Sequence, residues 1–134
     1  MTDVTGTFRA AVEAKDLAAI TRVLDPAVEF RSPVMPKPYQ GRDAVTTLLG
    51  VLLETFEDFH YTHDLAGRAR TGPPAQALVF GARVMGKAVQ GVDLITFNDA
   101  GLVADLTVMV RPLPAAMTLA RVVGRRMEEL AAPA

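Results

Sequence analysis

GVDLITFNDAGLVADLTVMVRPL, residues 91–113, predicts two long strands joined by a tight turn. Val92–Phe97 is apolar and β-branched almost throughout, which favours a strand that is covered on both faces. Asn98–Gly101 supplies the residue types that tolerate the left-handed backbone of a hairpin turn. Leu102–Arg111 then runs back as the second strand.

One residue breaks the apolar pattern of the first of these strands. Asp93 places a carboxylate in the middle of it, which is costly in a buried position unless the charge is paired or used. Two interpretations follow. Asp93 forms an ion pair with Arg83 or Arg31 inside the sheet, or it is the acid of a ligand pocket. In the second case burial raises its pKa, and the neutral acid can donate a hydrogen bond.

Composition limits the kinds of protein that this chain can be. Its 134 residues suit a single domain, residues 1–134, and half of them are hydrophobic, which leaves apolar surface for a ligand cavity or a partner. The 14 basic and 15 acidic residues are mixed along the chain, so we expect no nucleic-acid partner. There is no cysteine for disulfide or thiolate chemistry. No apolar run reaches ~18 residues, so we expect no membrane span and a cytoplasmic location.

Helix patterns dominate the first part of the chain. Thr2 or Asp3 can cap a first helix, and Asp16 can cap a second. Asp43 is the expected cap of a third helix that reaches about Glu57. Apolar residues recur at helical spacing in each segment, so each helix has one face for the core.

Strand patterns fill most of the remaining chain, at residues 28–31, 58–67, 76–85, 89–97 and 102–111. The proline-rich segment 32–40 is expected to be a loop, and a last helix is expected at about 115–130. Helices precede strands, which predicts an α+β fold. We expect a cone-shaped, curled, mostly antiparallel sheet with three helices from the N-terminal half on one face, plus the C-terminal helix. The open end of such a cone is a natural ligand cavity.

Six short motifs occur in an order that resembles one known superfamily. They are Lys15–Ile20, Asp25–Phe30, Tyr39–Val45, Phe56–Phe59, Gly91–Asp93 and Asn98–Gly101. The series resembles the nuclear transport factor 2-like superfamily, which has a cystatin-like fold and includes SnoaL-like polyketide cyclases, ketosteroid isomerases and limonene epoxide hydrolases. The resemblance covers about residues 5–112. It implies a fold and not one chemistry, since this fold carries many activities.

The isomerase pattern of that superfamily is only partly present. The resemblance places the general base, an acidic residue before a proline, at Ser32, and the tyrosine that stabilises the oxyanion at Phe8. Neither side chain can perform the role. The third group, a carboxyl on the penultimate strand, falls at Asp93. The resemblance therefore implies that steroid isomerisation by that mechanism is absent.

Two other patterns were compared with the chain in the same way. The epoxide hydrolase pattern keeps its arginine at Arg83, but Met85 and Val108 stand where it needs acids. The polyketide cyclases use a deep acid with a polar aromatic neighbour, and for Asp93 that neighbour can be His60, His63 or Tyr61. No carboxylate is suitably spaced from the two histidines, so we expect no metal and no cofactor.

Alternation along the strands predicts which residues face the cone. On the last strand the set for the cavity is Leu102, Ala104, Leu106, Val108 and Val110, and the set for a second subunit is Val103, Asp105, Thr107, Met109 and Arg111. Asp93 is the expected catalytic residue. The expected ligand-binding residues are Phe8, Ser32, Tyr39, Phe56, Tyr61, Phe80, Leu106, Val108 and Val110.

These residues favour a protein that binds a small hydrophobic molecule in an apolar cone containing one acid. An alternative is an enzyme of the isomerase, polyketide cyclase or hydrolase type that uses Asp93 as acid or base. A second alternative is a structural dimerisation domain whose cone is filled by side chains. In each case we expect a homodimer through the outer face of the sheet.

Overall fold

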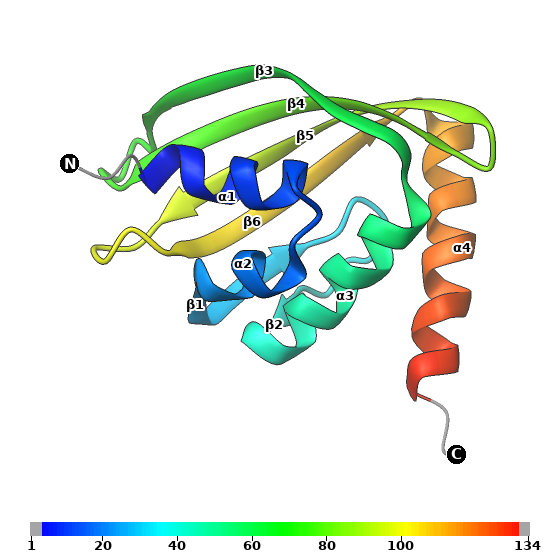
Figure 1. The fold of residues 1–134 in the computed structure, drawn as a ribbon, viewed down its shortest axis with the longest axis horizontal. Helices are drawn as coiled ribbons and strands as arrows, with labels where there is room; N and C mark the ends of the chain where they lie inside the picture. The colour runs from blue at the N-terminus through cyan, green and yellow to red at the C-terminus, as the bar shows by residue number, and fades with distance from the viewer. Residues whose placement is uncertain (1–3, 132–134) are drawn as a thin grey trace.

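In the computed structural model, which describes residues 4–131, four helices pack around one curled sheet (Figure 1). The predicted α+β fold with a mostly antiparallel sheet is confirmed. The expected caps Thr2 and Asp3 lie outside the described residues. The described helices are α1 (Val4–Glu13), α2 (Leu17–Arg22), α3 (Arg42–Thr55) and α4 (Leu113–Ala131). The strands are β1 (Leu24–Arg31), β2 (Tyr39–Gln40), β3 (Glu57–Arg68), β4 (Pro74–Val84), β5 (Lys87–Phe97) and β6 (Val103–Arg111).

Helix α2 begins where the sequence predicts and α3 does not. Asp16 caps α2, since its carboxylate accepts a hydrogen bond of 3.1 Å from the backbone N–H of Ala19. The predicted cap of α3 by Asp43 is wrong, because Gly41 is the capping residue and Asp43 lies in the first turn. The N–H of Gly41 donates to the carbonyl of Val28 at 2.8 Å, which fixes the chain reversal at a residue with φ 93°.

The strands lie in the order β2-β1-β6-β5-β4-β3. Strands β1 and β6 are parallel, and every other neighbouring pair is antiparallel. The predicted hairpin of β5 and β6 is confirmed. Its turn is closed by Asn98, whose side-chain oxygen accepts from the N–H groups of Ala100 and Leu102 at 2.9 Å each, and Gly101 supplies a φ of 79°.

The structure differs most from the predicted strands at β1 and β2. Strand β1 begins at Leu24, four residues earlier than predicted, because Leu24 pairs with Val103 of β6. The register of this pairing shifts between Leu24 and Glu29, and Pro26 falls in that irregular stretch. The end of the proline-rich segment is not a loop, since Tyr39 pairs with Phe30 of β1 to form the short edge strand β2. The prolines all precede Tyr39, so they remove no hydrogen bond from this pair.

A β-bulge in β6 changes which of its side chains face the core. Phe97 pairs with Val103 but Thr96 pairs with Asp105, so Ala104 is an extra residue on this strand. The predicted outward position of Val103 is therefore wrong, because the bulge turns its side chain into the core, where it is fully buried. Beyond the bulge the predicted alternation applies, with Val108 buried and Met109 exposed.

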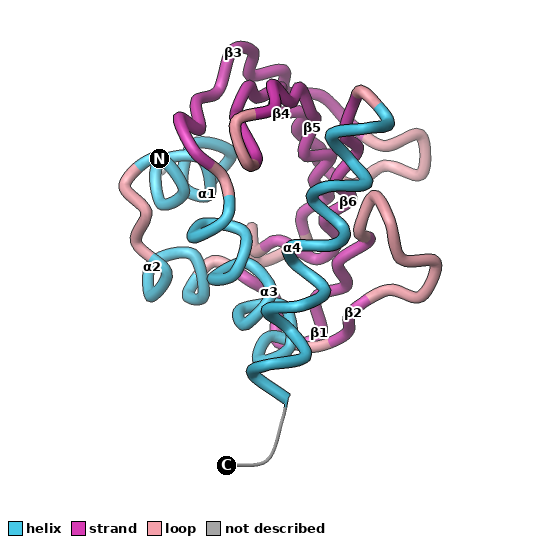
Figure 2. Tube along the Cα trace, turned by 90° about the vertical axis from the view of Figure 1, so that its right-hand side faces the viewer, coloured by secondary structure: helices cyan, strands magenta, loops and turns pink. Residues whose placement is uncertain are grey.

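Helices α1, α2 and α3 lie on the concave side of the sheet, and α4 runs across one end of it (Figure 1). Figure 2 shows the strands following an arc from β3 to β2 around these helices. The core fills the space between the helices and the inner face of the sheet, with Phe8, Phe30, Phe80 and Ile95 almost fully buried. None of the helices within residues 4–131 has the length and apolarity needed to span a membrane.

Candidate functional site

Asp93 lies on the inner face of β5, at the floor of a cavity beneath the helices. The alternation of β5 turns Val89, Gly91, Asp93, Ile95 and Phe97 inward, and all five are buried. Asp93 is only 8% exposed. A carboxylate in this position loses most of its hydration, so its surroundings decide its charge.

The hydroxyl of Tyr61 donates a hydrogen bond of 2.9 Å to Oδ2 of Asp93. Tyr61 comes from β3, and Phe80 of β4 pairs with both Tyr61 and Gly91. A side chain at position 91 has no room, because a Cβ there would lie 2.3 Å from Cζ of Phe80. The absence of a Cβ on Gly91 therefore lets the ring of Phe80 lie close to β5, near the acid.

Burial is the main cause of the unusual acidity of this pair. It raises the pKa of Asp93 from 3.8 to about 7, and the hydrogen bond from Tyr61 opposes that rise. Burial, followed by the neighbouring charge and hydrogen bond of Asp93, also raises the pKa of Tyr61 far above its usual value. Tyr61 therefore keeps its proton, and Asp93 exists near neutral pH both as a carboxylate and as a neutral acid.

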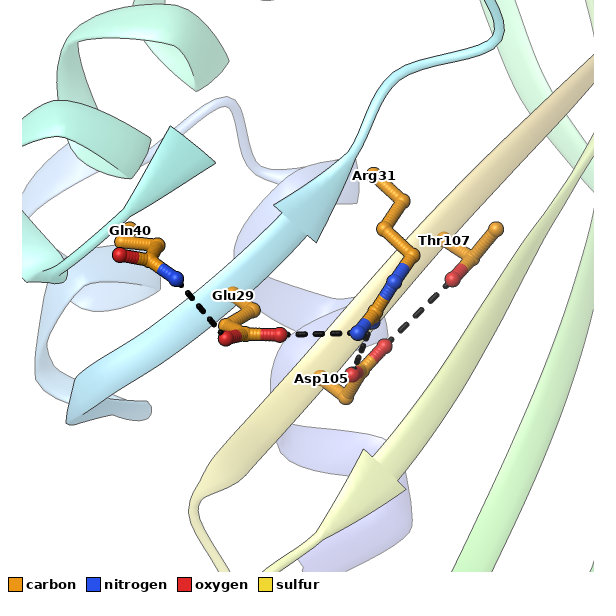
Figure 3. A network of polar contacts seen from close by, with 5 residues as sticks. All are labelled: Glu29, Arg31, Gln40, Asp105 and Thr107. Atoms are coloured by element: carbon orange, nitrogen blue, oxygen red, sulfur yellow. Dashed lines mark hydrogen bonds and ion pairs between the residues drawn. The ribbon is translucent and has the colours of Figure 1, made fainter. Parts of the chain in front are cut away.

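The alternative in which Asp93 forms an ion pair with Arg31 or Arg83 is wrong. Arg31 pairs with Glu29 at 2.8 Å and with Asp105, on the outer face of the sheet (Figure 3). Arg83 lies 3.7 Å from Asp58, and both side chains are mostly exposed. Alternation puts both arginines on the face opposite Asp93.

Six of the nine predicted ligand-binding residues line the cavity together with Asp93. They are Phe8, Phe56, Tyr61, Phe80, Leu106 and Val108. The cavity volume is about 70 Å³, within about 670 Å³ of empty space that includes the open mouth and the solvent there. The enclosed part is therefore smaller than a typical small-molecule pocket and suits a compact ligand. Among the described residues, the other charged side chains in the lining are Glu13, at the end of α1, and Lys15, just after it, and both are exposed.

Other lining residues were missed by the sequence reasoning. They are Val12, Ile20, Leu49, Leu52, Leu53 and Phe59, in addition to Glu13 and Lys15. Strand alternation identifies Phe59, because it lies two residues before Tyr61 and so shares the inward face of β3 with it. In the structure the centroids of the two rings are 5.0 Å apart. The aliphatic helix residues carry no such signal, since helical periodicity does not separate cavity lining from core.

Three predicted ligand-binding residues lie away from this cavity. Ser32 lines a second, smaller cavity near α4, and its hydroxyl oxygen accepts from the N–H groups of Val34 and Met35. Tyr39 packs edge-on against Phe30 at 6.4 Å, at the β2 edge of the sheet. Val110 packs against the core without lining the cavity of Asp93. The family resemblance and the strand alternation predict on which face of the sheet a residue lies. They do not predict how deep in the cone that residue lies.

Neither histidine is the polar aromatic neighbour of Asp93. His60 and His63 pair with Gly81 and Val79 of β4, and these two positions lie on the outer face of the sheet. Nδ1 of His60 lies 2.8 Å from the carbonyl of Asp58, and Nδ1 of His63 lies 2.9 Å from the hydroxyl of Thr62. Within residues 4–131 no three His, Asp or Glu side chains form a group that could hold a metal ion.

Comparisons with known proteins agree with this architecture. A SnoaL-like domain profile matches residues 4–106. No curated protein sequence matches the chain. A steroid delta-isomerase from Pseudomonas aeruginosa is 34% identical, with a TM-score of 0.85 and 98% of each chain covered.

Two further structures have related folds. An uncharacterised bacterial protein with a cystatin-like fold from Silicibacter pomeroyi is 30% identical, with a TM-score of 0.84 over 94% of this chain and 86% of that one. An NTF2-like protein of unknown function from Cytophaga hutchinsonii is 17% identical, with a TM-score of 0.62 over 84% and 90% of the two chains, and shows the fold alone. The matches confirm the resemblance and the fold class predicted from the sequence.

Proposed function

Because the chain belongs to the SnoaL-like family, we propose that it binds a small, largely apolar molecule in the cavity of Asp93 and holds the polar group of that molecule at Asp93 and Tyr61. One observation carries this proposal. A buried acid and a buried phenol, joined by a hydrogen bond, lie among side chains that are otherwise almost all apolar.

The chemistry of the pair defines the ligand class. Tyr61 always carries a proton, and the neutral form of Asp93 carries a second one. One of these two protons is used in the hydrogen bond from Tyr61 to Asp93, and the other can be donated to an oxygen acceptor of the ligand, such as a ketone carbonyl. A ligand with an anionic group at that end is disfavoured, because burial penalises a second negative charge and no cation among the described residues lowers the pKa of Asp93.

Ligand-induced stabilisation tests the proposal. The melting temperature would be measured at pH 6 with steroid ketones, terpenoid ketones and aromatic polyketides. At least one class is expected to raise it, with a smaller rise for Asp93→Asn. Asp105→Asn is the matched control, because Asp105 lies on the outer face beside Arg31. If no class stabilises the wild type, the filled-cone alternative explains the site better.

A second candidate function is proton transfer on a carbonyl compound. The pKa of Asp93 near 7 favours it, since a group that is half ionised at working pH can both accept and return a proton. The identity of 34% to the steroid delta-isomerase also supports it. The carboxylate of Asp93 would take a proton from the carbon next to a carbonyl. Once Asp93 is neutral, the hydroxyl of Tyr61 would turn from Asp93 to the enolate oxygen and donate its hydrogen bond there. The proton then returns to a carbon of the same molecule.

Exchange of hydrogen for deuterium separates binding from proton transfer. A ketone that binds would be incubated with the protein in D₂O and followed by proton NMR. Catalysis predicts loss of the signal of the hydrogens next to the carbonyl, and no acceleration with Asp93→Asn. A ketone that binds without faster exchange than in buffer leaves binding as the function and removes this second candidate.

A second copy of the chain is the partner that we propose for the outer face of the sheet. Leu65, Leu94 and Met109 are each exposed by more than 40% on this face. The less exposed Val79 and Val92 lie on the same face of β4 and β5, so the apolar surface is continuous across the sheet. The charged group of Glu29, Arg31 and Asp105 lies beside it and supplies a polar rim (Figure 3).

A further inference from the structure

Two cavities inside the fold share one wall. The acid cavity is the one that contains Asp93, with a volume of about 70 Å³, and the end cavity is the smaller one near α4, with a volume of about 30 Å³. Three residues line both cavities: Leu52, Phe56 and Val108. We call these three side chains the partition.

The partition is built from two elements that meet inside the cone. Leu52 and Phe56 are one helical turn apart at the end of α3, where the N–H of Phe56 donates to the carbonyl of Leu52 at 3.0 Å. Val108 comes from β6. All three side chains are apolar and belong to the hydrophobic core or pack against it, so they are held by dispersion contacts without directional hydrogen bonds.

Strand register places Val108 between the acid and the end cavity. Val108 pairs with Asp93 of β5, and on its other side Thr107 pairs with Arg31 of β1. Ser32, which follows Arg31, is therefore at the level of Val108 and lines the end cavity. The side chain of Val108 therefore lies between Asp93 and Ser32.

We propose that the partition selects ligands by length, so that the protein takes a compact ketone in the acid cavity and excludes longer apolar tails from the end cavity. The inference rests on the proposed function, because the polar end of the ligand is placed at Asp93 and Tyr61. A longer tail needs the space that Val108 and Phe56 fill. Apart from Ser32, the lining of the end cavity is apolar, so a tail that passes the partition enters a suitable environment.

A homologous series of ligands makes this selection measurable. The probes are straight-chain 2-alkanones from 2-hexanone to 2-dodecanone, and the readout is the dissociation constant from calorimetric titration at pH 6. Each methylene that enters an apolar cavity tightens binding about fourfold. In the wild type, the affinity is expected to stop rising with chain length once the 2-alkanone fills the acid cavity.

Variants of the partition should move that limit. Val108→Ala and Phe56→Leu, from different elements, are expected to extend the gain by two or more methylenes. Leu49→Ala is the matched control, because Leu49 lines the acid cavity alone, and Leu119→Ala is the second, because Leu119 lines the end cavity alone. Neither control should extend the limit past the partition. An unchanged limit in both partition variants overturns the inference.

Xenon gives a readout that needs no ligand. Crystals of wild type and Val108→Ala would be placed under xenon, which enters dry apolar cavities. Xenon in the space vacated by Val108, connecting the two cavities, supports the inference, and a repacked space without xenon overturns it. If no 2-alkanone binds to the wild type, the proposed function fails for this ligand class and xenon alone decides on the partition.

Discussion

The phenolic oxygen of Tyr61 lies 2.9 Å from Oδ2 of Asp93, although β4 separates the strands that carry them. Phe80 of the intervening strand pairs with both Tyr61 and Gly91, and its ring lies against Gly91. The contact with Tyr61 gives the acid its one identified stabilising interaction inside an apolar cavity. It also makes the charge of the site depend on pH in the neutral range.

Asp93 should make the protein less stable as the pH rises. Its pKa is raised to about 7 by burial, so between about pH 4 and pH 7 the folded protein binds more protons than the unfolded chain. The free energy of unfolding then falls by up to about 1.4 kcal/mol per pH unit in that window. Asp93→Asn should lack this slope, whereas Asp105→Asn should keep it. Urea denaturation at four pH values measures this, and parallel profiles for wild type and Asp93→Asn would contradict the assignment.

Tyr61→Phe should raise the pKa of Asp93 further, because the hydrogen bond that stabilises the carboxylate is lost. The loss should cost about 1 kcal/mol of stability. Carbon-13 NMR of the Asp93 carboxyl group across the pH range gives the titration midpoint. The only other tyrosine, Tyr39, packs against Phe30 instead, so Tyr39→Phe is expected to leave the midpoint in place. A midpoint that Tyr61→Phe lowers would show that another group holds the acid.

Gly91→Ala should destabilise the fold by about 1–3 kcal/mol, as overpacking typically does. The added Cβ would lie 2.3 Å from Phe80 and 2.8 Å from the carbonyl oxygen of Met109, and the backbone atom cannot move aside freely. Gly67→Ala is the control, because it meets nothing within 4 Å. Equal midpoints of chemical denaturation for the two variants would refute the close packing of Phe80 on β5.

Met109→Glu should dissociate the proposed dimer, since it places a charge in the apolar part of the outer face. Met117→Glu serves as control, because Met117 is 62% exposed on α4, away from that face. Light scattering at micromolar concentration measures the molar mass. A wild type that is monomeric at every concentration tested would remove the second copy as a partner.

Isomerisation of a 5-ene-3-ketosteroid should be slow compared with a dedicated isomerase. Ser32 lies in the end cavity, bonded to backbone N–H groups, and Phe8 has no hydroxyl. Loss of general-base catalysis alone typically costs ~10²–10⁴-fold. The ultraviolet absorbance of the conjugated product measures the rate. Turnover in the range of a dedicated isomerase would mean that Asp93 or another group replaces the missing base.

The sequence predicts the fold because its signals are local and repeated. Turn residues such as Asn98 and Gly101 define the hairpin, and alternation gives the inward face of β5 that carries Asp93. Alternation fails at Val103, because the bulge depends on pairing with β5 and leaves no mark in the sequence of β6.

The site is predicted less completely than the fold. Asp93 lies on the expected strand and Ser32 directly follows β1, yet the partition separates them. The side chains of the partition resemble any other core residues in the sequence. The sequence leaves the partner of Asp93 open among His60, His63 and Tyr61, because the pairing of β3 with β4 decides which of these side chains point inward. Only the curl of the sheet brings β3 and β5 together at this depth.

The pairing of β1 with β6 also constrains the order in which the chain folds. Strands β3 to β6 form successive hairpins with neighbours along the chain. In contrast, β1 pairs with β6, which is synthesised about 75 residues later. During translation β1 therefore has only the two-residue strand β2 as a partner until β6 leaves the ribosome. We expect pulse-labelled hydrogen exchange to protect the amides of β4 and β5 before those of β1, and simultaneous protection would contradict this order.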